Sequence, residues 1–190
     1  NRDLQQWFGL VDRGSAIVDR SGLEQVDFLQ EGASNGTLVR TIETNAAAGA
    51  DGWFIDLITP GATDTGERMV VPNIFRGGAL IGVTRIPDNS NNDPCNASGA
   101  TGFIMAINPF TGGRLNTPPF DINGDGTFDA NDGLNGTPGA GFGLDAGTYS
   151  PLLISDRFYL NDQNANITQG RVPFGTQPPV RVSWREIIRN

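Results

Sequence analysis

The chain has 190 residues, 37% of them hydrophobic, and a formal net charge of −8 at pH 7. This size and apolar content suffice for a folded domain with a core, while 26 glycines and 12 prolines predict many loops. The acidic balance excludes recognition of nucleic acid or anionic lipid by charge alone, because both require clustered positive charge.

All 13 basic residues are arginine, and the chain has neither lysine nor histidine. A Schiff-base lysine, a phosphate-loop lysine, a histidine general base and a histidine metal ligand are therefore excluded. The single cysteine, Cys95, is expected to be a loop thiol without a role, and it allows no disulfide within the chain. The chain opens on Asn1 rather than methionine, which indicates a mature or truncated fragment.

Short segments rich in β-branched and aromatic residues, separated by Gly, Pro, Asn and Asp, predict strands along most of the chain. Residues 4–11 come first, and they fit a helical apolar stripe and a strand equally well. The predicted strands that follow are GWFIDLI (52–58), MVVPNIF (69–75), GALIGVTRI (78–86), GFIMAINPF (102–110), SPLLIS (150–155), RFYLN (157–161) and VRVSW (180–184). The segment SWREII admits one closing helical turn.

A weak internal repeat suggests how these strands are organised. Residues 71–84 and 150–160 each combine a strand that starts near a proline, a two-residue turn and a second strand, with turns predicted at 77–78 and 156–157. Residues 102–115 add a strand, an NPFTGG turn and a return. Such units in series are typical of β-propeller blades of about 40 to 50 residues. A β-sandwich is the competing interpretation.

Two long polar stretches, 87–99 and 116–148, are predicted to be loops. The second contains DINGDGTFDAND, residues 121–132, with four aspartates and no basic residue. Counted from its first aspartate, this segment matches the EF-hand calcium loop through the glycine at position 6, and only the last residue differs, Asp for Glu. The candidate ligands are Asp121, Asn123, Asp125, the carbonyl of Thr127, and Asp129.

Short oxygen-bearing side chains at alternate positions converge when the chain curls round one ion, and Gly126 permits the sharp turn. A divalent cation would offset the repulsion among the carboxylates, and an all-oxygen ligand set on a flexible loop favours Ca²⁺. Asp132 is either a weak ligand or a residue that supports the ligands without contacting the ion. The alternative is a solvated acidic turn. The spacing of Asp162, Asn164 and Asn166 resembles half a calcium loop, although a plain turn is the simpler interpretation.

Several blocks in this order resemble the C-terminal domain of the type IV pilus tip-associated adhesin family, the PilY-type proteins. The blocks are GWFIDLITPG, GERMVVPNIFRGGALIGVTRIP, DPCNASGATGFIMAINPFTGGRL, FDINGDGTFD and VSWREI. The resemblance covers about residues 50 to 190, and the first fifty residues fit less distinctly. The block TGFIMAINPFTGGRL alone is not specific, because quinoprotein propeller repeats are similar to it.

The resemblance implies an all-β fold, the last blades of a modified, quinoprotein-like β-propeller, so that residues 1–190 are one domain or its C-terminal part. It also implies one calcium ion in a nine-position loop, with the five ligands named above and Asp132 outside the pattern. Members of the family are exported to the cell surface, the outer membrane or the pilus tip. They support pilus assembly, extension and retraction, and attachment, which implies minor pilins, the assembly machinery and a host-cell or abiotic surface as partners.

The leading hypothesis is therefore a calcium-binding module of pilus biogenesis and adhesion that is not an enzyme. A quinoprotein-type propeller dehydrogenase is the alternative, but Asn116 stands where its TGxxxW signature would place tryptophan. A dockerin-like docking module would need two calcium loops with flanking helices, and the sequence has one good loop. The sequence does not identify a surface receptor.

Overall fold

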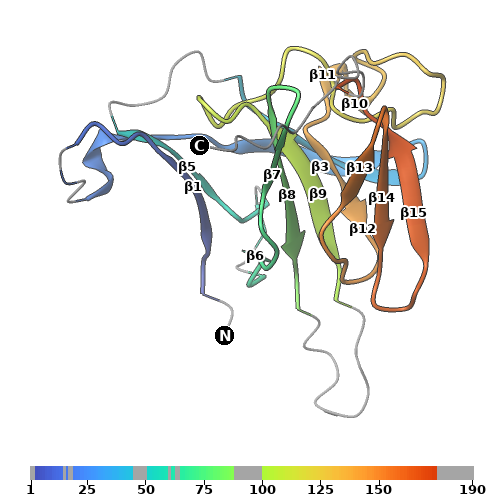
Figure 1. The fold of residues 1–190 in the computed structure, drawn as a ribbon, viewed down its shortest axis with the longest axis horizontal. Coiled ribbons are helices and arrows are strands. Elements are labelled where there is room, and N and C mark those ends of the chain that lie inside the picture. Colours follow the sequence, from blue (N-terminus) through green and yellow to red (C-terminus); the bar gives the residue numbers. More distant parts are fainter. Residues whose placement is uncertain are drawn as a thin grey trace, which may run out of the picture.

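A computed structural model describes residues 3–14, 16, 19–44, 51–59, 61–62, 65–87 and 100–174 of the chain (Figure 1). The described part is all-β, as the sequence predicts, apart from one short 3₁₀ turn, η1 (Arg20–Gly22). The strands are β1 (Gln6–Leu10), β2 (Leu23–Gln25), β3 (Phe28–Ser34), β4 (Thr37–Ile42), β5 (Gly52–Asp56), β6 (Arg68–Met69), β7 (Ile74–Arg76), β8 (Ala79–Arg85), β9 (Gly102–Ile107), β10 (Gly133–Leu134), β11 (Thr137–Pro138), β12 (Gly141–Leu144), β13 (Leu152–Ile154), β14 (Arg157–Asn161) and β15 (Ile167–Arg171). No helix in these ranges has the length and apolar character needed to cross a membrane.

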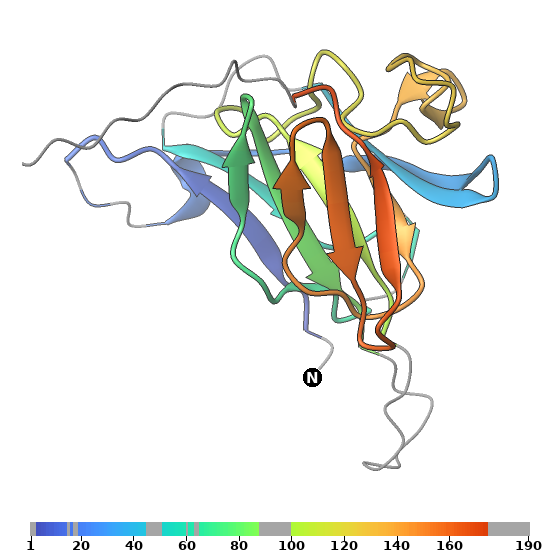
Figure 2. The same ribbon diagram turned by 45° about the vertical axis from the view of Figure 1, so that its right-hand side comes forward.

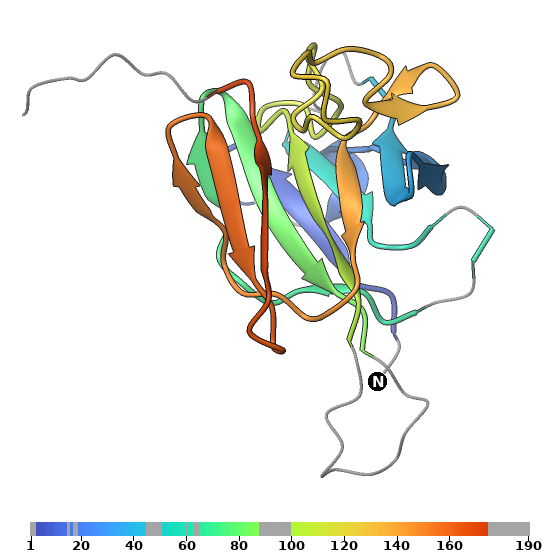
Figure 3. The ribbon, with the colours of Figure 1, turned by 90° about the vertical axis from the view of Figure 1, so that its right-hand side faces the viewer.

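Three sheets are stacked as layers, as Figures 2 and 3 show. The middle layer is a seven-stranded sheet in the order β3-β4-β12-β9-β8-β6, with β7 also paired to β8. Sheets of three strands, β1-β5-β2 and β13-β14-β15, lie on its two faces. A separate two-stranded ribbon is formed by β10 and β11. The stack has two apolar interiors, one on each side of the middle sheet.

Strand β9 explains why the middle sheet can be covered on both sides. Its residues Phe103, Met105 and Ile107 belong to the core facing β1 and β5, together with the buried Trp53. The alternating residues Ile104 and Ala106 belong to the core facing β14. Successive side chains of a strand point to opposite faces, so a strand buried on both faces reads as a continuous apolar run. The run GFIMAI is such a strand, and all six of its residues are buried.

Most of the predicted elements are confirmed. Segment 4–11 forms a strand rather than a helix, because β1 pairs antiparallel with β5. The turn at Gly77–Gly78 has φ values of 58° and 83°, the left-handed conformation that two-residue hairpin turns need. The NPFTGG segment turns as predicted, with the N–H of Asn108 donating to the Gly113 carbonyl at 2.9 Å. VRVSW, SWREII and Cys95 lie outside the described residues.

Other predictions are wrong in detail. The predicted strand 69–75 is broken, because residues 70–73 leave the sheet between β6 and β7. The second hairpin turns at 155–156, one residue before the predicted position. Stretch 116–148 is not loop throughout, because it contains β10, β11 and the central strand β12. The hairpin β3–β4 was not predicted, although its Asn35–Gly36 turn is a strong hairpin signal.

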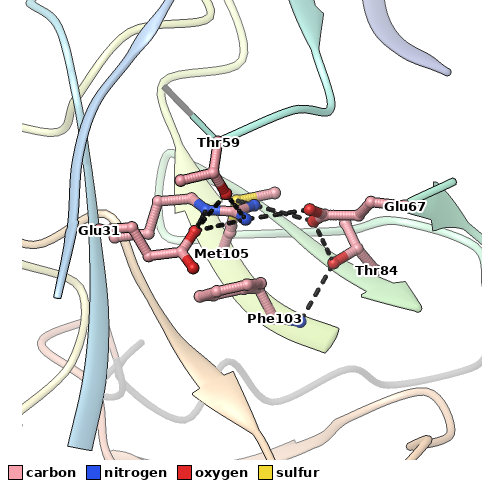
Figure 4. A network of polar contacts seen from close by, with 7 residues as sticks. Glu31, Thr59, Glu67, Thr84, Phe103 and Met105 are labelled. Carbon is pink, nitrogen blue, oxygen red and sulfur yellow. Dashed lines mark hydrogen bonds and ion pairs between the residues drawn. The ribbon is translucent and has the colours of Figure 1, made fainter. Parts of the chain in front are cut away.

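A polar network lies beside the core that faces β1 and β5, against Phe103. Arg40 is fully buried and pairs with the buried Glu67 through two hydrogen bonds of 2.8 and 2.9 Å. Its Nη2 also contacts Glu31 at 2.8 Å, and its guanidinium carbon lies 3.6 Å from the Phe103 ring centroid. Figure 4 shows Glu31, Glu67, Thr59 and Thr84 converging at this point. The network joins β3 and β4 to β8 and to the segment before β6.

Candidate metal centre

The acidic loop is held at both ends by the fold. Phe120, immediately before it, is 3% exposed and packs edge-to-face against Phe142 and Phe158, with ring centroids 5.2 and 5.5 Å apart. The N–H of Asp121 donates to the carbonyl of Arg171 at 3.4 Å, which joins the loop to the end of β15. At the other end, β10 begins directly after the loop. The loop therefore starts from the core that faces β14.

Asp132 is fully buried and closes the loop through its carboxylate. Its Oδ1 accepts the backbone N–H groups of Ile122 at 2.7 Å and Asn123 at 3.2 Å. Its Oδ2 accepts the N–H of Asp129 at 3.1 Å. Both oxygens thus bind backbone donors that an apolar side chain would leave unsatisfied.

Asp121 and Gly126 form the turn of the loop. Gly126 has a φ of 85°, a left-handed conformation that favours glycine, and its N–H donates to Asp121 Oδ2 at 3.1 Å. The second oxygen, Asp121 Oδ1, is buried and has no hydrogen-bond partner. A buried carboxylate oxygen without a donor is costly, because it has lost water and gained nothing in return.

Asp125 and Asp129 make local hydrogen bonds. Asp125 Oδ1 accepts the Thr127 hydroxyl at 2.5 Å and the Thr127 N–H at 2.7 Å, while Asn123 Nδ2 donates to Asp125 Oδ2 at 2.9 Å. These bonds hold the pKa of Asp125 below its ordinary value, and the Thr127 hydroxyl contributes most. Asp129 Oδ1 accepts the N–H of Asn131 at 2.7 Å. Both carboxylates are thus turned toward donors of their own loop.

The loop therefore has the curled backbone that the sequence argument requires, without gathered carboxylates. Within the described ranges, no three Asp, Glu, His or Cys side chains stand together where they could hold a metal ion. The candidate residues nevertheless fit a hard dication by their chemistry. Their ligand atoms are all oxygens. The buried Asp121 Oδ1 accepts no hydrogen bond, and a cation could interact with it instead.

Arg171 is a residue of this site that the sequence analysis missed. Along the chain, the arginines nearest to the loop are Arg114 and Arg157, and neither forms a hydrogen bond or ion pair with it among the described residues. In the fold, Arg171 Nη1 donates to the Gly126 carbonyl at 3.4 Å, and its guanidinium carbon lies 6.0 Å from the Phe128 ring centroid. Its Nε lies 3.5 Å from Asp156 Oδ2. Gly126 and Arg171 are 45 residues apart along the chain, so no local sequence pattern indicates this contact.

The weaker acidic motif forms a turn. Asp162 Oδ1 accepts the N–H groups of Asn164 at 2.8 Å and Asn166 at 2.9 Å, while Asn166 Nδ2 donates to its Oδ2 at 3.0 Å. These bonds, led by the one from the Asn166 side chain, lower the pKa of Asp162. The motif thus shapes the β14–β15 turn, and local donors use both carboxylate oxygens.

The stacked sheets, with an acidic loop at one end of the stack, place the chain among all-β proteins built from blade-like units. It shares its fold with a solved structure described as the Pseudomonas aeruginosa PilY1 C-terminal domain, a β-propeller, at a TM-score of 0.68 and 19% identity. The match covers 90% of this chain and 37% of that domain. The described residues themselves form no closed sheet.

Sequence comparison identifies the family. The chain is 46% identical over 191 residues to a type IV pilus biogenesis factor PilY1 homolog of Xylella fastidiosa. It is 30% identical over 138 residues to the type IV pilus biogenesis factor PilY1 of Pseudomonas aeruginosa strain UCBPP-PA14. The Xylella match includes all of this chain but only 15% of that protein. The Pseudomonas match includes 73% of this chain and 11% of that protein. No protein-family model matches. The chain belongs to the PilY1-type family of type IV pilus biogenesis factors.

Proposed function

We propose that this chain is a calcium-binding, non-enzymatic module of a type IV pilus biogenesis factor. Family membership supports the link to the pilus, and the relatives are named for pilus biogenesis. The observation that carries the calcium assignment is the buried Asp121 Oδ1, an acceptor without a donor inside an all-oxygen loop. A bound divalent cation supplies the positive charge that offsets repulsion among the loop carboxylates.

The ligands in this proposal are Asp121, Asn123, Asp125, the Thr127 carbonyl and Asp129. Asp125 gives up the hydrogen bonds from Thr127 and Asn123 when its carboxylate turns inward. Asp129 likewise releases the N–H of Asn131. Asp132 keeps its three backbone hydrogen bonds and maintains the loop closure in both states.

These rearrangements have a cost that lowers affinity. Two aspartates lose existing hydrogen bonds when they coordinate the ion, so the net free energy of calcium binding is less favourable than at a preformed site. A Kd on the order of 10⁻⁴ to 10⁻³ M is expected, which is typical of extracellular calcium modules. The proposed location is accordingly the cell surface, the outer membrane or the pilus tip, where the ion is abundant.

The names of the relatives support the non-enzymatic assignment over a quinoprotein dehydrogenase, because both are described as type IV pilus biogenesis factors. In the proposed role, calcium binding orders the loop and so adjusts its contacts with minor pilins and the assembly machinery. These contacts in turn affect pilus extension, retraction and attachment to host-cell or abiotic surfaces.

The test is calcium-dependent thermal stability of the protein and two matched variants. Asp125→Ala removes a proposed ligand, whereas Asp162→Ala removes a half-buried aspartate outside the loop with the same kind of turn hydrogen bonds. Millimolar calcium should raise the melting temperature of the parent and of Asp162→Ala, but not of Asp125→Ala. Equal responses from the two variants would reject the ligand assignment. In cells, Asp125→Ala should alter pilus-driven twitching motility, and Asp162→Ala should not.

A further inference from the structure

Arg171 places a positive charge beside the acidic loop. Its Nη1 donates to the Gly126 carbonyl at 3.4 Å, and a Cβ built on Gly126 would lie 2.9 Å from the same nitrogen. The Arg171 side chain is 42% exposed, so water weakens its field without removing it. The loop itself carries four aspartates within twelve residues.

Neighbouring groups keep the Arg171 side chain near the loop. Asp156 contacts its Nε at 3.5 Å, and the N–H of Val172 donates to the Asp156 carbonyl at 2.9 Å. The Arg171 carbonyl accepts the N–H of Asp121 at 3.4 Å. The last residue of β15 therefore contacts the loop through both its backbone and its side chain.

We propose that Arg171 sets the calcium affinity of the loop by stabilising its ion-free form. This inference depends on the proposed calcium site. Without the ion, the guanidinium lies against the loop at the Gly126 carbonyl and offsets part of the negative charge of the loop aspartates. With a dication among the ligands, the same guanidinium faces an added positive charge. A group that stabilises the ion-free form more than the bound form lowers affinity by linkage.

This role differs measurably from that of a simple tether. A tether would support the loop in both states, so its removal would lower stability and weaken calcium binding together. Charge compensation instead predicts that the stability of the ion-free protein and its calcium affinity change in opposite directions. Loss of the Arg171 charge lowers the stability of the ion-free protein and tightens calcium binding.

The experiment titrates calcium by calorimetry and measures melting in chelator for four proteins. These are the parent, Arg171→Gln, Arg171→Lys and Arg85→Gln. Arg85 is a suitable control because it ends β8, at the end of the sheet away from the loop, and its Nη2 donates to Gln163 at 2.7 Å (Figure 1). Arg85→Gln changes the net charge by the same amount as Arg171→Gln.

Arg171→Gln should bind calcium about two- to tenfold more tightly and melt at a lower temperature in chelator. Arg171→Lys should stay near the parent affinity because it keeps the charge, and Arg85→Gln should bind as the parent does. Raising the salt from about 50 to 500 mM should narrow the difference between Arg171→Gln and the parent. Unchanged or weaker binding by Arg171→Gln overturns this inference while leaving the calcium site intact. Absence of binding by the parent overturns both proposals.

Discussion

The Asp132 carboxylate accepts a hydrogen bond from the Ile122 N–H at 2.7 Å, joining residues ten positions apart and closing the acidic loop. Asp132 is fully buried, and its two oxygens serve three backbone donors in all. The aspartate at the last position of the motif therefore has a function that requires no metal. It holds the loop curled while Asp125 and Asp129 remain exposed.

Removing Asp132 should destabilise the protein whether or not calcium is present. Asp132→Ala leaves three N–H groups without their acceptor, so we expect a loss of about 2 kcal/mol in the free energy of unfolding. Urea denaturation in chelator measures this loss. Asp125→Ala is the comparison, because its hydrogen bonds are exposed to water and its effect in chelator should be small. If Asp132→Ala costs no more than Asp125→Ala in chelator, the closing role is wrong.

Gly126 should tolerate a side chain less well than the neighbouring Gly124. Both glycines have positive φ, 85° and 75°, so alanine is strained by about 1 kcal/mol at either position. A Cβ on Gly126 also meets Arg171 at 2.9 Å, whereas one on Gly124 meets nothing within 4 Å. Chemical denaturation should show a larger loss for Gly126→Ala. Equal losses would mean that the Arg171 side chain moves aside without cost.

The Arg40 network should depend strongly on both partners being present. Arg40→Met leaves Glu67, which is 1% exposed, as an uncompensated buried charge, at a cost of about 3 to 5 kcal/mol. Arg40→Met combined with Glu67→Met removes that charge and should be less destabilising than Arg40→Met alone. Guanidinium denaturation of the two variants gives the comparison. A double variant less stable than the single one would show that Glu67 has other essential contacts.

The turn between β14 and β15 should respond to acid through Asp162. Its hydrogen bonds from Asn166 and Asn164 lower its folded-state pKa below the ordinary value of 3.8. The contribution of these bonds to stability is therefore complete above the unfolded pKa and is lost as pH falls through the lower folded pKa. An NMR titration of the Asp162 carboxyl should give a midpoint below 3.8. A midpoint at or above that value would contradict the turn geometry.

The sequence predicted features with local causes. Short runs of β-branched and aromatic residues located β8, β9 and β14, and paired glycines located the turn at 77–78. Strand β12 was missed because GAGFGL reads as a glycine-rich loop. Its glycines are instead required by close packing, since a Cβ on Gly141 would lie 2.3 Å from the Ile104 carbonyl oxygen.

In the candidate site, too, the sequence predicts the local features and misses the contacts between distant segments. The spacing of the aspartates and Gly126 is local, and the structure gives the loop its turn. The closing role of Asp132 and the approach of Arg171 depend on how distant segments meet, so spacing could not reveal them. The buried pairing of Arg40 with Glu67 is likewise tertiary, since 27 residues separate the partners. Register between non-neighbouring strands decides such contacts, and one sequence carries little information about it.

Bound-metal analysis tests the central claim most directly. In equilibrium dialysis against calcium at several millimolar, the parent should bind one calcium ion per chain, measured by atomic emission as the excess over the protein-free compartment, and Asp125→Ala should bind none. A parent protein that binds no calcium at equilibrium, and whose melting temperature is unchanged by millimolar calcium, would contradict the account. The acidic loop would then be a turn held together by its own hydrogen bonds.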